Sequence, residues 1–135
     1  MRRGTAVLLA SAVLSGCSGG SDDDPKPIEG APKEVTEAVA ALEAATRERD
    51  FQRICDELLA RAARKRAGGE DCAELLRSTA GDVRRPKISP LSIRVRGEGA
   101  DVRVRTTARG QAAIEDTIRL VREGGRWRIA ALAGG

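Results

Sequence analysis

The sequence contains no histidine and no tyrosine, and its aromatic residues are one tryptophan and one phenylalanine. Without histidine, the chain can build neither a Ser-His-Asp nor a Cys-His catalytic arrangement, and most zinc sites are excluded as well. Acid–base chemistry would depend on Asp and Glu side chains alone. A glycine-rich phosphate loop is also missing, because "RGEGAD" (96–101) lies at a predicted hairpin rather than between a strand and a helix. The sequence therefore predicts no metal and no cofactor.

Long apolar runs are missing too, and the apolar segment near the start, Thr5–Leu14, is short. Its about ten residues are half of the roughly 20 that a membrane-spanning helix needs, but they match the apolar core of a signal peptide. Two arginines precede it, and "LSGC" (14–17) ends it. This order resembles the lipobox of bacterial lipoproteins, in which a diacylglyceryl group is attached to the cysteine thiol and a peptidase cuts just before it. We therefore predict a signal peptide over residues 1–16 and lipidation of Cys17; the alternative is an ordinary signal peptide that happens to contain a cysteine.

The segment after Cys17 is rich in Gly, Pro and Asp, and Ile28 is its only large apolar residue. Such a composition cannot bury enough apolar surface to offset conformational entropy, which predicts a disordered tether over residues 17–32. The run Asp22–Asp24 lacks further ligands at a fixed spacing, so we interpret it as solvated charge rather than as a metal site. Lipid and tether together predict a protein anchored to the cell membrane on its extracytoplasmic face.

Lipidation of Cys17 leaves two cysteines, Cys55 and Cys72. In an exported chain, a remaining pair usually forms a disulfide. Both lie on apolar faces of predicted helices, and their bond would close a loop of about 18 residues, which contributes about 3 kcal/mol. The alternative is a redox pair or a metal site, but the spacing is not CxxC and histidine is absent. We favour the structural disulfide.

The first half of the predicted domain, which we place at residues 33–135, has the apolar spacing of helices. A first helix starts near Pro32, and its apolar stripe is formed by Val35, Ala38, Val39, Leu42 and Ala45. A second helix is capped by Asp50 and runs to "RKRAGG" (64–69). Its stripe is formed by Phe51, Ile54, Cys55, Leu58, Leu59 and Ala62. A third, short helix extends from about Asp71 to near Gly81.

After Pro86 the apolar spacing changes to a period of two residues, which is typical of strands. The turns fall at "GEGA" (97–100) and at "GG" (124–125), and the last strand is "RWRIAAL" (126–132). Helices followed by an antiparallel meander predict an α+β domain. We expect the N-terminal helices to pack on the concave face of a curved antiparallel sheet of about four strands.

Four features of the predicted domain follow one another along the sequence, two in its helical half, one before its third helix and one in its strands. They are an amphipathic first helix, a helix that starts at "DFQRIC" (50–55), a cysteine before "AELL" (73–76) and strands that close on "LVREGGRWRIAAL" (120–132). Their order resembles the nuclear-transport-factor-2-like superfamily and, within it, the small exported lipoproteins of actinobacteria. The resemblance implies a cone of curved sheet around helices, whose mouth often holds a ligand or an active site. Cyclases and dehydratases of the superfamily rely on His and Asp, and its isomerases on Asp beside Tyr, whereas this chain has neither His nor Tyr.

Asp116 and Trp127 are the candidate pocket residues. If the apolar residues of 114–120 face inward, Asp116 shares their side of the strand. A bulge or the strand edge would instead turn it to solvent, and we favour this second arrangement. Trp127, one of two aromatic residues, is expected to be buried beside Phe51 and the helices.

Positive charge is concentrated in the second half of the chain, where residues 82–135 carry twelve Lys or Arg against six Asp or Glu. The strand alternation places seven arginines on the outer face of the sheet: Arg94, Arg96, Arg103, Arg105, Arg119, Arg126 and Arg128. We favour a solvated face in an arginine-rich chain; the alternative is attraction to anionic phospholipids, wall polymers or an acidic protein. Nucleic acid is not an expected partner, because no aromatic residues alternate with the arginines to stack on bases.

From these features we predict an exported, lipid-anchored domain that is not an enzyme. It would bind a small ligand or a partner protein at the cell envelope, through the cone mouth or the basic sheet. The alternative is an enzyme of the cyclase or isomerase kind with a carboxylate-only site in the cone. A closed apolar interior would exclude the enzyme, whereas two inward carboxylates in an open pocket would favour it.

Overall fold

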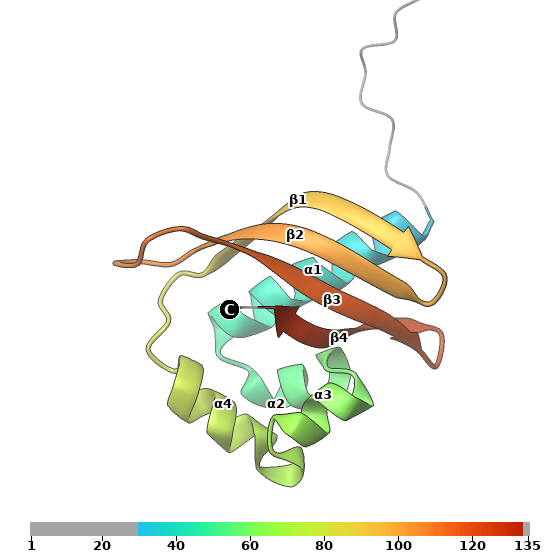
Figure 1. Ribbon diagram of the computed structural model, residues 1–135. Coiled ribbons are helices and arrows are strands. Elements are labelled where there is room, and N and C mark those ends of the chain that lie inside the picture. The colour runs from blue at the N-terminus through green and yellow to red at the C-terminus, as the bar shows by residue number, and fades with distance from the viewer. Residues whose placement is uncertain (1–29, 134–135) are drawn as a thin grey trace, which may run out of the picture.

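The computed structural model describes residues 30–133, so the predicted signal peptide, Cys17 and most of the predicted tether lie outside the described residues. The helices are α1 (Ala31–Glu48), α2 (Phe51–Arg53), the π-helix η1 (Ile54–Leu58), α3 (Arg61–Arg66), the 3-10 helix η2 (Gly69–Asp71) and α4 (Cys72–Ala80). The strands are β1 (Lys87–Arg96), β2 (Gly99–Thr107), β3 (Ile114–Glu123) and β4 (Arg126–Ala133). All helices therefore precede all strands, as the sequence predicts (Figure 1).

Helix α1 begins at Ala31, slightly before the predicted domain start at residue 33. Pro32 stands in its first turn, where a missing backbone N–H costs no helical hydrogen bond. Arg49 caps the C-terminal end of the helix: it has a left-handed conformation (φ 61°), and its N–H donates a hydrogen bond to the Thr46 carbonyl. Its buried stripe consists of Val35, Val39, Leu42 and Ala45, which are the predicted positions except for half-buried Ala38.

The prediction of one continuous second helix is wrong. Asp50 does cap α2, accepting a hydrogen bond from the Arg53 N–H at 3.0 Å. After η1, however, Leu59 is extended and pairs with Ile129 of β4, and the Ala60 N–H donates to the Ile129 carbonyl at 2.8 Å. Pairing with this strand edge ends the helix, and α3 starts afresh at Arg61. The predicted helical stripe is therefore broken after Leu58.

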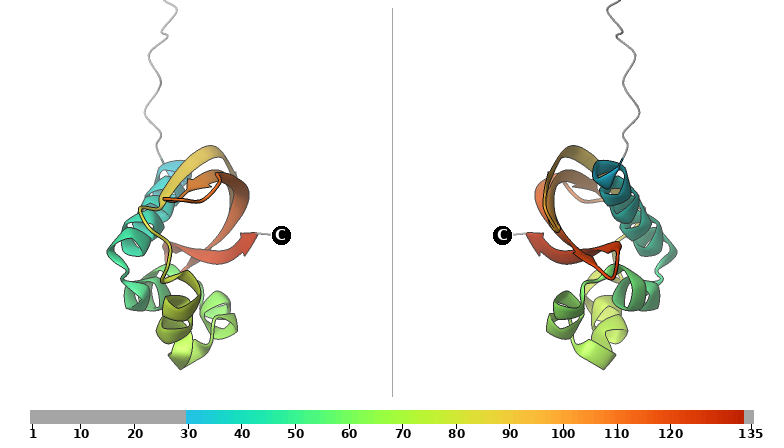
Figure 2. Two further views of the ribbon diagram at one scale, coloured as in Figure 1. Left: turned by 90° about the vertical axis from the view of Figure 1, so that its left-hand side faces the viewer. Right: turned by 90° about the vertical axis from the view of Figure 1, so that its right-hand side faces the viewer.

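The four strands form one antiparallel sheet in the order β1-β2-β3-β4, as a simple meander. Both predicted hairpins are present, and Gly124 and Gly125 have positive φ, which a tight two-residue hairpin turn requires. The register shifts between Pro90 and Ser92 and again between Arg119 and Leu120. Such bulges bend strands, and Figure 2 shows the sheet curling around α1.

The core lies between α1 and the concave face of the sheet. Its buried side chains come from both layers and include Val35, Val39, Leu42, Phe51, Val102, Leu120, Trp127 and Ile129. Inward strand residues such as Val102, Val104 and Leu120 follow the period of two. Leu91, which that period places on the same side as Ile93 and Val95, instead falls at the β1 bulge and is 48% exposed. The predicted α+β class and the placement of the N-terminal helix on the concave face are confirmed. None of the helices within residues 30–133 is long and apolar enough to cross a membrane.

Candidate functional site

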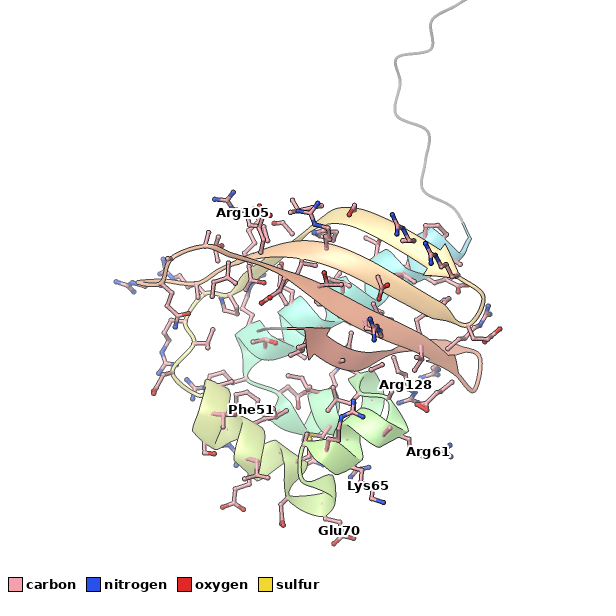
Figure 3. The ribbon with its side chains drawn as sticks, in the orientation of Figure 1. Phe51, Arg61, Lys65, Glu70, Arg105 and Arg128 are labelled. Atoms are coloured by element: carbon pink, nitrogen blue, oxygen red, sulfur yellow. A yellow bond between two sulfur atoms is a disulfide. The ribbon has the colours of Figure 1, made fainter. Side chains whose placement is uncertain are left out.

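A cavity of about 620 Å³ lies between the concave face of the sheet and the helices that follow α1. Its deep wall is formed by buried apolar side chains, among them Phe51, Val104 and Ile129. Figure 3 shows Phe51 between the helical layer and the sheet. At its rim, Ile114 and Leu132 line the cavity although they are 54% and 65% exposed. The cavity is therefore apolar in depth and opens to solvent past two large apolar residues.

Few charged groups line this cavity. Within the described chain, Asp116 is the only carboxylate among the lining residues and Arg66 the only cation. Asp116 pairs with buried Val104 across the β2–β3 ladder, so the two side chains share the inner face, and Asp116 is half-buried. Arg66 is already engaged, because its Nη2 donates to the Ala130 carbonyl.

The inward position of Asp116 corrects the expectation that a bulge or a strand edge would turn it to solvent. The β3 bulge lies at Arg119–Leu120, beyond Asp116, and the pairing of β2 with β3 runs without interruption from Gly99 to Thr106. A closed interior would have excluded an enzyme, and two inward carboxylates would have favoured one. The cavity is open and has one carboxylate among its described lining residues, so it meets neither condition. Among residues 30–133, no group of three or more His, Cys, Asp or Glu side chains is placed to hold a metal ion.

Trp127 is buried as predicted, with 7% of its surface exposed, but it does not line the cavity. Its indole Nε1–H donates to the Glu34 carboxylate at 3.1 Å, which joins the start of β4 to the first turn of α1. The expectation that Trp127 is a pocket residue is therefore wrong. Its role in the described structure is to close the core beside α1, and the hydrogen bond satisfies its polar atom.

The fold and this cavity can be compared with known proteins. The sequence matches no protein-family model and no curated protein. Among solved structures, it is similar to a substituted protein titled Rd1NTF2_05, with a TM-score of 0.60 and 13% identity over 77% of this chain and 98% of that one. It is also similar to an NTF2-like protein of unknown function from Shewanella baltica, with a TM-score of 0.56 and 12% identity over 75% of this chain and 89% of that one. The fold is NTF2-like.

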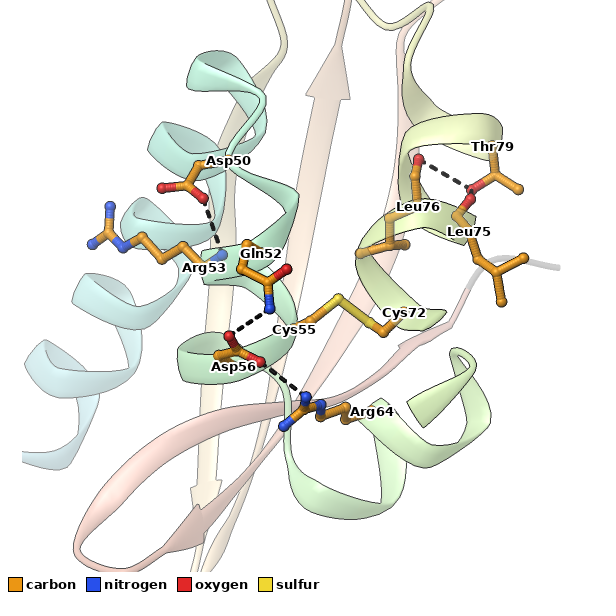
Figure 4. The surroundings of a disulfide bond; sticks show 10 residues. All are labelled: Asp50, Gln52, Arg53, Cys55, Asp56, Arg64, Cys72, Leu75, Leu76 and Thr79. Carbon is orange, nitrogen blue, oxygen red and sulfur yellow. Dashed lines mark hydrogen bonds and ion pairs between the residues drawn. A yellow bond between two sulfur atoms is a disulfide. The ribbon is translucent and has the colours of Figure 1, made fainter. Parts of the chain in front are cut away.

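In this NTF2-like domain, Cys55 and Cys72 form the predicted disulfide, with a Cα–Cα distance of 6.1 Å. Both cysteines are buried. Figure 4 shows the bond joining η1 to the first turn of α4. The covalent link holds α4 against the segment that carries Phe51 and Ile54, and Leu76 and Ala80 of α4 line the cavity. The disulfide thus fixes one wall of the candidate site.

The predicted basic face is present on β1, β2 and β3 of the NTF2-like domain. On β4, Arg126 is exposed as expected, whereas Arg128 is not. Arg94 and Arg119 both pair with Asp101 across the sheet, so they share its outer face. The exposed arginines of this face are Arg94, Arg96, Arg103, Arg105 and Arg119. Arg128, by contrast, is half-buried and donates from Nη1 to the Glu57 carbonyl at 2.9 Å. Figure 3 shows Arg105 above the sheet and Arg128 below it, next to the helical layer.

Two parts of the site were missed from the sequence. Leu132 lines the cavity rim from the last strand, and Arg66 does so from α3. The apolar alternation of 126–132 places Leu132 on the face opposite Trp127 and Ile129, and the register shift between Arg119 and Leu120 brings it beside inward-facing Ile118. No local signal marked Arg66, since its place depends on the break at Leu59 and on the Ala130 carbonyl of a distant strand.

Proposed function

We propose that this chain is an exported lipoprotein, anchored through Cys17, whose NTF2-like domain binds an apolar small molecule without transforming it. The cavity is the observation that carries the proposal. Its volume of about 620 Å³ is within the range of about 300–1,000 Å³ that small-molecule sites occupy. Its wall is mainly aliphatic, with Phe51 as the aromatic side chain and three threonines, Asp116 and Arg66 as the polar ones among the described lining residues. This lining favours an apolar ligand or the apolar part of a larger one.

Export and anchoring are supported by the sequence, in the order of positive charge, apolar core, small residues and Cys17. An anchored domain with a cavity suits a ligand that is poorly soluble in water and therefore partitions into membranes. Moving such a ligand from the bilayer into water costs free energy, and an apolar cavity close to the membrane offsets that cost.

The enzyme alternative depends on Asp116, the carboxylate that lines the cavity. A single carboxylate can move a proton, but the chain contains no Tyr or His to stabilise a developing oxyanion. Arg66 is the other charged lining residue, and its guanidinium already donates a hydrogen bond to the Ala130 carbonyl. We therefore favour binding. Asp116→Asn distinguishes the two, because it removes a proton acceptor while keeping the shape of the side chain.

The cavity is tested by titrating the protein with the neutral fluorescent probe N-phenylnaphthylamine. We expect saturable binding by the native chain and about tenfold weaker binding by Ile114→Lys, which adds a charge at the apolar rim. Asp116→Asn should bind the probe at least as well as the native chain, because it removes a charge from the cavity.

Leu91→Lys is the matched control. Leu91 is exposed to a similar degree as Ile114, at 48% against 54%, but it lies at the β1 bulge and does not line the cavity. This variant should bind the probe within about twofold of the native chain, since its charge stays in water. Equal losses in both lysine variants, or no saturable binding by the native chain, would overturn the proposed site.

A further inference from the structure

The outer face of the sheet carries more positive charge than its own carboxylates balance. Arg103 is paired with Glu115 at 3.2 Å and Arg119 with Asp101 at 3.1 Å. The three remaining exposed arginines of the face make no ion pair with any residue of the described chain, and these are Arg94, Arg96 and Arg105. Lys87 adds a further exposed charge, because it pairs with Thr107 on the same side of the β1–β2 ladder.

This face lies on the side of the domain at which the chain enters it. Figures 1 and 2 show the first turn of α1 beside the C-terminal end of β1, on the side of the molecule away from α3 and α4. Ala31 and Val95 of β1 both pack, partly buried, against the core cluster. The segment leading back to Cys17 therefore joins the domain next to the arginines of β1 rather than next to the helical layer.

We propose that the outer face of β1, β2 and β3 docks on the anionic phospholipid headgroups of the membrane. Guanidinium groups form charge-assisted, bidentate hydrogen bonds with phosphate oxygens, and each basic residue near an anionic surface adds to the attraction. The proposal goes beyond the cavity and rests on the proposed anchoring only for bringing the face to a membrane. Docking holds the sheet against the bilayer and directs α3 and α4 away from it.

The test uses the full chain with Cys17→Ser, so that no lipid contributes, and co-sedimentation with vesicles. One set of vesicles contains phosphatidylcholine alone and the other phosphatidylcholine with phosphatidylglycerol. A triple variant neutralises the face with the substitutions Arg94→Gln, Arg96→Gln and Arg105→Gln. The control neutralises three exposed cations on the helical side, with Arg61→Gln, Lys65→Gln and Arg77→Gln, and Figure 3 shows Arg61 and Lys65 opposite Arg105. Both variants lose the same net charge and keep the same leader.

Neutralising the sheet face should weaken binding to the anionic vesicles about tenfold, and the helical control should change it by less than about twofold. Binding of the native face should also fall steeply as salt is raised, because surface charges are screened. Equal losses in both triple variants would overturn the proposal, since net charge alone would then explain the attraction. Equal binding to both vesicle types would also overturn it, and so would binding to a soluble anionic polymer without binding to vesicles. Because Cys17 is replaced throughout, a failure here is distinct from a failure of anchoring.

Discussion

At the scale of single residues, Trp127 is the largest side chain of the buried core. It is buried between β4 and α1, and its Nε1–H is satisfied by Glu34. Trp127→Ala should lower the free energy of unfolding by about 3–5 kcal/mol, because a large cavity is left in a small core. Denaturant unfolding measures this loss.

The milder variant Trp127→Phe separates packing from the hydrogen bond. It keeps an aromatic ring and removes the donor to Glu34, so about 1 kcal/mol should be lost beyond the change in buried area. The native fluorescence should be blue-shifted and poorly quenched by iodide. A red-shifted, freely quenched emission would contradict the burial of the indole.

The same scale shows where sequence reasoning succeeds and where it stops. Strand alternation placed Arg94, Arg103 and Arg105 correctly on the outer face, because that pattern is local. It failed for Arg128, whose Nη1 is held by the Asp56 and Glu57 carbonyls at the end of η1. A partner some seventy residues away in the chain leaves no periodic trace. Asp116 was uncertain for a related reason, since its face depends on where the bulge falls.

At the scale of elements, the disulfide between η1 and α4 compensates for weak packing around α3. The described α3 buries only Ala63 and carries charged side chains on most other positions. Replacing both cysteines by serine should lower the free energy of unfolding by about 3 kcal/mol, the cost expected for reopening this loop. Probe binding in the cavity should weaken as well, because α4 forms part of its wall.

The disulfide itself is checked by intact-mass measurement of protein from the cell envelope, alkylated with and without prior reduction. We expect Cys55 and Cys72 to react only after reduction. Two thiols that react without reductant would contradict the bond.

The helices and strands themselves were predictable to different degrees. Helix α1, both hairpins and α4 follow from local spacing, caps and turn glycines. The break after η1 did not, because Phe51 to Leu59 continue a helical stripe without interruption. Leu59 and Ala60 pair with Ile129 at the edge of β4. Because this partner is distant in the chain, no local pattern predicts the pairing.

At the scale of the whole molecule, the order of helices before a meander sheet predicted the α+β class, and the resemblance carried by the cysteines and the last strand implied the NTF2-like architecture. The extent of the cavity was not predicted, because it depends on the gap between α4 and the sheet and thus on loops with no periodic pattern. Leu132 and Ile114 show this plainly: both face inward, yet both are exposed where the cavity opens. The alternation predicts the inward face of Ile114 but not that this side chain stays uncovered, and for Leu132 the register shift changes the face that the alternation predicts.

The attachment of the molecule to the membrane is predicted to depend on one thiol. The full chain, expressed in a bacterium, should incorporate a fatty-acid probe, and Cys17→Ser should abolish the labelling and prevent cleavage before residue 17. Cys72→Ser is the matched control: the same substitution at a cysteine that is 1% exposed and bonded to Cys55 should leave the labelling intact.

Flotation with membranes in about 1 M salt completes the test, because a Debye length of about 3 Å leaves little attraction between the arginines and the headgroups. Under that condition the lipid can hold the domain on the bilayer but the basic face cannot, so the native chain should float. If Cys17→Ser is labelled equally, the anchor lies elsewhere. If the native chain floats only at low salt, the basic face alone binds the membrane and the lipid anchor is disproved, because a covalent acyl chain is insensitive to ionic strength.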